Sequence, residues 1–296
     1  PPRSARPGVD LEFLFAQLQP DKDTVDTTPN CGNMLAAVVP FALETGLARA
    51  QGDTTTLRGL VRCVVTVRAL DHGVHSGMFG GPIPDALTIL CRLVATLHDP
   101  SGEVTVPGLS QGSAAELDYD EARLRAESGV LDSVRLLGSG SILSRLWTKP
   151  TMSVIGINAP SVENASNTLL PTASAKLSMR IAPHEDPERA FELLRDHLLA
   201  QDVWGAEVTV VKSDVGAGFS ADTTGPIYDQ ARAALADAWD GRESVEMGVG
   251  GSIPFVAAFA ERFPDAAILI TGVEDPDTRA PVSYTHLRAH ETVLDL

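Results

Sequence analysis

The chain is poor in several residue types, and each shortage narrows the possible functions. It has only 3 cysteines, Cys31, Cys63 and Cys91, which form no CxxC pair of the kind that holds a structural metal. No apolar run has the length of a membrane span, and no apolar core of a secretory signal follows the first residues. We therefore expect a protein of a reducing compartment, the cytoplasm, without disulfides or a membrane segment.

Positive charge is also scarce. Lys and Arg total 23 against 39 Asp and Glu, which gives a net charge of −16. Such a surface repels nucleic acid and anionic lipid, so we expect neither as a partner. Hydrophobic residues make up 44% of the chain, as in globular proteins, and 296 residues leave room for two modest domains.

One loop, 71–81, combines two histidines, an aspartate and four glycines. Glycine lets the backbone approach a ligand closely and adopt tight turns. An imidazole beside such a turn favours a loop that handles substrate, because binding residues concentrate on positioned loops. A connector whose histidines only face water is the alternative reading.

Periodicity predicts the architecture around this loop. Val61, Cys63, Val65 and Val67 alternate along the first expected strand, which is therefore buried on one face. The predicted elements are, in order, a strand at Leu57–Leu70, a helix at Pro82–Leu97, strands at Met152–Ile157 and Ala173–Ile181, a helix at Asp186–Leu199 and a strand at Glu207–Val211. The order β-α-β-β-α-β is typical of a ferredoxin-like split βαβ unit.

Two further segments accompany this unit. A long insertion, Asp99–Lys149, has a charged and helical centre at Tyr119–Glu127. After Ser213 the pattern predicts helices at Pro226–Trp239 and Pro254–Phe263, followed by a buried strand at Ala266–Thr271. A strand covered on both faces requires parallel neighbours, which this segment alone cannot supply.

The loop also carries a family resemblance. Leu70–Gly77, followed by Gly80–Leu87, closely resembles the lid entry of the co-catalytic zinc dipeptidases, the aminoacylase and carnosinase-like metallopeptidases. The resemblance runs from about Thr56 to Ala280. Four more stretches occur in the family's order and spacing: Asn167–Pro171, Lys176–Arg180, Gly250–Pro254 and Thr271–Ala280.

The resemblance implies a dipeptide-like substrate, two zinc ions and a homodimer formed through the lid domain. It implies that His75, arriving from the partner subunit, stabilises the developing oxyanion. Arg180 and the turn of Gly251 and Ser252 match the residues that hold the substrate carboxylate, and Asn167 matches a lid asparagine near the same pocket. The forked guanidinium of arginine suits a carboxylate.

The chain departs from the family at the metal ligands. The family places most ligands before the lid, and none of those motifs occurs upstream of Leu57, where the sequence has no histidine at all. Pro281 stands where the last ligand, a histidine, is expected. Zinc needs three or four ligands in a fixed geometry, so we expect no metal ligands and no hydrolysis by the chain as written.

Both ends resemble something else. Pro29–Val38, with Pro40–Leu47 after it, resembles the methylaconitate-type isomerases of the diaminopimelate-epimerase fold, which implies that Cys31 is an acid/base at a helix start. Val282–Thr292 resembles a translated sequencing adapter, so His286 and His290 are not taken as a zinc pair despite their spacing.

These observations predict an α+β and α/β organisation: a ferredoxin-like lid or dimerisation domain plus an incomplete α/β catalytic-domain fragment. The expected units are an isomerase-like fragment at 1–53, the lid domain at 54–212 with its insertion at 99–149, the catalytic-domain part at 213–280 and an artefactual tail at 281–296. Three functions remain open: a metal-dependent dipeptide hydrolase by descent, a cysteine-dependent isomerase fragment, and a non-catalytic dimerisation module.

Overall fold

The computed structural model describes residues 54–112, 119–238 and 254–270, four single positions between 241 and 248, and two short paired strands, β1 (Gln17–Leu18) and β2 (Val25–Asp26). Six residues singled out above lie outside the described residues: Cys31, Gly251, Ser252, Pro281, His286 and His290.

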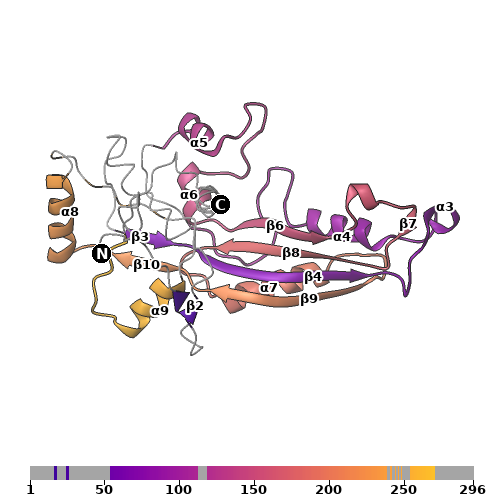
Figure 1. Cartoon of the computed structure of the whole chain (residues 1–296). Helices are drawn as coiled ribbons and strands as arrows, with labels where there is room; N and C mark the ends of the chain where they lie inside the picture. The colour runs from indigo at the N-terminus through magenta and orange to yellow at the C-terminus, as the bar shows by residue number, and fades with distance from the viewer. Residues whose placement is uncertain are drawn as a thin grey trace, which may run out of the picture.

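A four-stranded antiparallel sheet forms the centre of the molecule (Figure 1). Its strands are β4 (Gly59–Arg68), β6 (Thr151–Asn158), β8 (Thr172–Ile181) and β9 (Glu207–Gly216), in the spatial order β6-β8-β4-β9. The helices α4 (Ala86–Ala95) and α7 (Pro187–Leu199) connect them. The order β4-α4-β6-β8-α7-β9 confirms the predicted split βαβ unit.

The core lies between one face of this sheet and the two helices. Helix α4 contacts β4 and β8, whereas α7 contacts β4 and β9. Along β4 the predicted alternation holds, because Val61, Cys63, Val65 and Val67 are completely buried. From α4 and α7, Leu90 and Leu194 meet them in the same core. The even-numbered residues of β4 lie on the opposite face, which no helix of the unit covers.

Two boundaries differ from the prediction for local reasons. Helix α4 begins at Ala86 and not at Pro82, because the extended Asp85 caps it by accepting a hydrogen bond from the N–H of Thr88 at 2.9 Å. Strand β9 continues to Gly216 and not only to Val211, because it pairs with β4 as far as Leu60, past a register shift at which Ser213 of β9 has no partner in β4.

The insertion 99–149 contains helix α5 (Glu121–Ser128), where a helical centre was predicted, and α6 (Ile142–Trp147). A short strand, β3 (Thr54–Leu57), pairs with β10 (Phe219–Asp222), so the chain enters and leaves the sheet unit side by side (Figure 1).

After β10 the structure has α8 (Pro226–Ala238) and α9 (Pro254–Arg262), close to the predicted helices. The predicted strand at Ala266–Thr271 is wrong over its described part, 266–270, which is irregular. A strand forms only when its backbone groups pair with a neighbour, and no described strand lies beside this segment. Among the described residues, no helix is long and apolar enough to span a membrane.

Candidate functional site

The histidine predicted to contact substrate lies at one end of the sheet, beyond the ends of β4 and β8. His75 ends β5 (Val74–His75), which pairs with β7 (Thr168–Leu169), and directly precedes the short helix α3 (Ser76–Phe79). The Ser76 N–H donates to the Asn167 carbonyl at 2.8 Å. The fold therefore brings His75 and Asn167, distant in sequence, into adjacent positions.

The start of α4 holds this loop in place. One carboxylate oxygen of Asp85 accepts from the N–H of Leu170 at 2.6 Å, while the other caps α4. The N–H of Ala86 donates to the Leu170 carbonyl at 3.1 Å. These bonds join the segment after β7 to the core helix, so the exposed His75 stands on a supported loop rather than a free one.

Arg180 lies near the other end of β8, opposite Leu60 of β4 and Thr151 of β6. It is half-buried. Burial, and then the nearby charge of Arg62, lower the pKa of Arg180. Arg62 itself contacts Asp214 at 3.0 Å.

A third guanidinium belongs to the same end of the sheet. Arg58 is only 4% exposed and donates to the Leu146 carbonyl at 3.0 Å and to the Thr151 hydroxyl at 2.9 Å. Burial, and then the charge of Arg180, lower the pKa of Arg58 to about 10, so it remains a cation at neutral pH. Arg58, Arg62 and Arg180 thus bring three positive charges to this end of the sheet, and positive charge attracts an anion.

The sequence did not single out Arg58 and Arg62. Arg62 alternates onto the uncovered face of β4, where an arginine is ordinarily solvated. Arg58 is buried because the end of the insertion, at Leu146 and Lys149, closes over it. A contact between segments so far apart in sequence leaves no local signal.

The two ends are far apart within one chain. Arg180 stands eight positions along β8 from Thr172, which lies beside the loop of His75. At about 3.3 Å per residue the separation is about 26 Å. Figure 1 shows α3 and β7 at one end of the sheet and β3 with β10 at the other. The fold brings His75 and Asn167 together at one end of the sheet and leaves Arg180 at the other end.

The described residues do not fit the zinc centre that the resemblance implies. No group of three or more His, Cys, Asp or Glu side chains in this part of the chain is arranged to hold a metal ion. His72 illustrates this, since its exposed ring contacts the adjacent Asp71 carboxylate and joins no such group of described residues.

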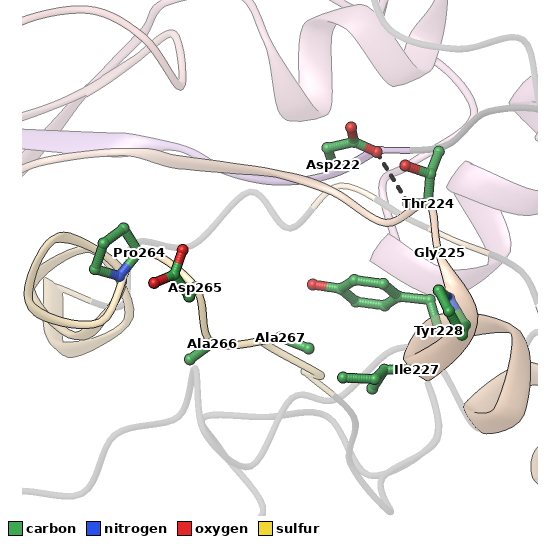
Figure 2. Close-up of a pocket in the computed structure, with 10 residues that line it drawn as sticks. Asp222, Thr224, Gly225, Ile227, Tyr228, Pro264, Asp265, Ala266 and Ala267 are labelled. Atoms are coloured by element: carbon green, nitrogen blue, oxygen red, sulfur yellow. Dashed lines mark hydrogen bonds between the residues drawn. The ribbon is translucent and has the colours of Figure 1, made fainter.

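A shallow pocket lies elsewhere, between the start of α8 and the turn after α9. Figure 2 shows the phenol of Tyr228 pointing from α8 toward the turn that contains Asp265. The Tyr228 hydroxyl accepts a hydrogen bond from the N–H of Ile268 at 3.1 Å. None of the predicted site residues lines this pocket.

Comparison with known proteins gives two family matches. The family described as peptidase dimerisation domain, of the M20 group, matches residues 55–206, and the family described as PrpF protein matches residues 2–77. Both agree with the resemblances inferred from sequence. The N-terminal stretch is also similar to (4E)-oxalomesaconate Delta-isomerase of Novosphingobium, 51% identical over 53 residues that cover 18% of this chain and 15% of the relative.

The larger part is similar to dipeptidases. Cysteinylglycine-S-conjugate dipeptidase of Corynebacterium striatum is 34% identical over 226 residues, covering 75% of this chain and 50% of the relative. The solved structure of the dipeptidase Dug1p from Saccharomyces cerevisiae has the same fold, with a TM-score of 0.65 at 20% identity over 77% of this chain and 50% of that one.

The chain thus spans about half the length of these dipeptidase relatives. The matched segment, 55–206, contains the sheet unit from β4 to α7, with the His75 loop and Arg180 inside it. By this match the chain belongs to the M20 peptidase dimerisation domain family.

Proposed function

We propose that this chain is the lid and dimerisation part of a dipeptide-hydrolysing metallopeptidase, and that its substrate-contacting residues work in pairs of chains. The single observation that supports this is the separation of His75 from Arg180. A dipeptide extends only about 7 Å, whereas the stretch of β8 from Thr172, beside the His75 loop, to Arg180 is about 26 Å long. One substrate molecule can contact both only if they come from different copies.

Strand β6, an edge of the sheet in the part of the chain that the structure describes, is the surface we propose for that pairing. It carries no charged residue, and Val154, Ile155 and Ile157 are 46%, 52% and 54% exposed. The other edge strand, β9, carries Glu207, Lys212 and Asp214. Charged side chains protect a sheet edge from pairing, and an uncharged apolar edge favours it.

The geometry of such a pair brings the two ends together. Two identical edges related by a two-fold axis pair antiparallel. The Thr151 end of β6, which lies beside Arg180, then meets the Asn158 end of the second copy, which lies toward the His75 loop. The joined sheet would thereby place the cationic end of each chain next to the histidine loop of the other.

Each residue then has a role that its chemistry supports. Arg180, with Arg58 and Arg62 beside it, would attract the substrate carboxylate, and His75 would donate a hydrogen bond to the carbonyl oxygen. Gly251 and Ser252 stay a predicted part of the carboxylate site. When bound, zinc would polarise the scissile carbonyl. Because the described residues offer no donor set for it, no step is assigned to it in this chain.

Sedimentation velocity tests the pairing. We expect the wild-type chain to be a dimer, and Ile157→Lys to raise the dimer dissociation constant at least about 100-fold, since each interface would bury two unpaired ammonium groups. Val211→Lys, at a position 62% exposed on the opposite edge, is the matched control and should leave the dimer intact. A monomeric wild type, or equal dissociation by both variants, would contradict the proposal.

Substrate binding is tested separately, by NMR titration with a dipeptide such as Cys-Gly. Arg180→Met should weaken binding at least about tenfold, because a charge-assisted bond contributes about 1.5–3 kcal/mol. The dipeptide amide, which lacks the carboxylate, is the control and should bind weakly to both forms. We expect no hydrolysis after addition of zinc; turnover with bound stoichiometric zinc would show that a complete centre exists.

A second candidate function rests on the N-terminal stretch alone. Its match to the PrpF family over residues 2–77 supports a cysteine-dependent isomerase in which Cys31 moves a proton. Proton exchange of a methylaconitate-type acid, followed by NMR, tests this. Cys31→Ser should abolish exchange, whereas Cys91→Ser, which alters an exposed cysteine in α4, should not. The cytoplasm remains the proposed compartment for either function.

A further inference from the structure

The imidazole of His75 caps the helix that follows it. The backbone N–H of Gly77 donates a hydrogen bond to Nδ1 of His75 at 3.1 Å. We propose that this bond fixes His75 as the Nε2–H tautomer and so makes Gly77 a positioning residue for the proposed hydrogen-bond donor. The inference rests on the proposed function only for the use made of that donor; the tautomer itself is a property of the loop.

The backbone around the ring is held from the partner strand. His75 pairs with Thr168 in the ladder of β5 and β7, and the next N–H, of Ser76, donates to the Asn167 carbonyl at 2.8 Å. Glycine at position 73 lets the two strands approach closely, since a Cβ there would stand only 3.0 Å from the Thr168 methyl group. The main chain that carries the imidazole is thus held in place by backbone contacts that do not involve the ring.

The hydrogen bond then decides where the ring proton lies. A neutral imidazole has one N–H and one acceptor nitrogen. Because Nδ1 accepts from Gly77, the single proton belongs on Nε2. Within the described residues Nε2 has no hydrogen-bond partner, and His75 is exposed. In this form Nε2 can donate to a carbonyl oxygen and cannot accept a proton there, so the loop supports a donor and not a base.

The absence of a side chain at position 77 permits this contact. A Cβ on Gly77 would stand 3.0 Å from Cε1 and 3.2 Å from Nδ1 of His75, closer than ordinary carbon contacts. The backbone of Gly77 is not in the left-handed region, so alanine would be tolerated by the main chain. The ring would have to move away, and the amide would lose its acceptor.

Gly81 offers a matched control in the same loop. A Cβ there would have nothing within 4 Å, and its backbone also lies outside the left-handed region. Gly77→Ala and Gly81→Ala therefore make the same chemical change four positions apart in the loop, and only the first touches the imidazole.

The test is a two-dimensional ¹H–¹⁵N long-range NMR spectrum of the ring nitrogens. It is recorded near pH 8.5, about two units above the ordinary pKa of histidine. We expect His75 in the wild type and in Gly81→Ala to show only the Nε2–H pattern, and the Gly77 amide to exchange slowly. In Gly77→Ala the Nδ1 shift should move toward that of a protonated nitrogen, as the two tautomers mix, and amide exchange at position 77 should accelerate at least about tenfold.

A wild-type spectrum with the proton of His75 on Nδ1, or with a mixture unchanged by Gly77→Ala, would overturn the inference. The wild-type measurement stands alone if Gly77→Ala does not fold. These outcomes are independent of the proposed function, because a fixed tautomer can occur in a chain that neither dimerises nor binds a dipeptide. Conversely, a dimer that binds dipeptides with a mixed tautomer would refute only the role of Gly77.

Discussion

The four-stranded sheet and the segment after β10 differ in how completely they bury their apolar side chains. The buried core cluster extends from Val61 to Leu198 and consists mainly of residues of the sheet and its two helices, with Val106 and Leu109 added from the insertion. In the later segment, Ile227 of α8 is 56% exposed, and Phe263, just after α9, is 50% exposed. The two regions have similar helical patterns in sequence, yet among the described residues the core cluster belongs to the first region alone.

The difference shows what each region needs from elsewhere. The sheet unit contains both layers of its core, the strands and the helices, and can therefore bury its apolar side chains without another segment. The segment after β10 contains helices with no described sheet beneath them, and Leu269, in the stretch expected to be a buried strand, is 55% exposed. Burial of its apolar side chains would need neighbouring strands, and the described residues include none beside it.

Amide hydrogen exchange should reveal the largest contrast. We expect the central amides of β4 and β8 to exchange only through global unfolding, about 5–15 kcal/mol above the native state. The amides of Ala267, Leu269 and Ile270, which belong to no described helix or strand, should exchange with almost no protection, whereas that of Ile268 donates to the Tyr228 hydroxyl. Mass spectrometry of exchanged peptides measures both in one sample. Equal protection in the two regions would contradict the proposed difference in how they bury their apolar side chains.

Truncating one apolar side chain in each region is the next test. Leu177→Ala, at a completely buried position of β8, should lower the free energy of unfolding by about 3 kcal/mol. Ile227→Ala, at the exposed position in α8, should change it by less than about 0.5 kcal/mol. Urea denaturation gives both values. A large loss with Ile227→Ala would mean that α8 packs against a core.

The border of the sheet unit can be examined through Arg58. Its guanidinium joins the start of β4 to the end of the insertion through the Leu146 carbonyl and the Thr151 hydroxyl. Arg58→Met should lower stability by about 2 kcal/mol, because these buried acceptors lose a charged donor. Arg68→Met is the matched control: its pair with Glu207, at 3.5 Å, is exposed and should contribute less than about 1 kcal/mol. Comparable losses would show that burial of Arg58 is not decisive.

The sequence could predict the sheet unit because its signals are local. Alternation along β4 and β8 identifies their buried faces without knowledge of any partner. The start of α4 was misplaced because a cap depends on which polar side chain turns back, here Asp85. The predicted strand at Ala266–Thr271 failed because an apolar run becomes a strand only beside others, and that information is not in the run.

The candidate site divides in the same way. His75, Asn167 and Arg180 were predicted by resemblance, and the structure adds how they are arranged: the first two adjacent, the third at the opposite end. Arg58 could not have been found, since its burial depends on contacts with the distant insertion. The hydrogen bond from Gly77 to His75 joins residues two positions apart. Whether Nδ1 is its acceptor depends on the rotation of the imidazole, which the sequence motif does not predict.

The smallest expected effect concerns Glu185, which precedes α7 and has a side chain only 2% exposed. Burial alone would raise its pKa, but the N–H of Ser110, at 2.6 Å, and the charge of Arg189 outweigh burial, and the pKa is lowered. A carboxyl group whose pKa falls on folding stabilises the protein above its unfolded pKa, about 4.3, and loses that contribution as pH falls through the folded value. Glu185→Gln should therefore lower stability by about 1 kcal/mol at pH 7 and by progressively less below about pH 4. Urea denaturation across this range measures the difference. A difference that stays constant with pH would assign the effect of the substitution to packing and not to the charge of Glu185.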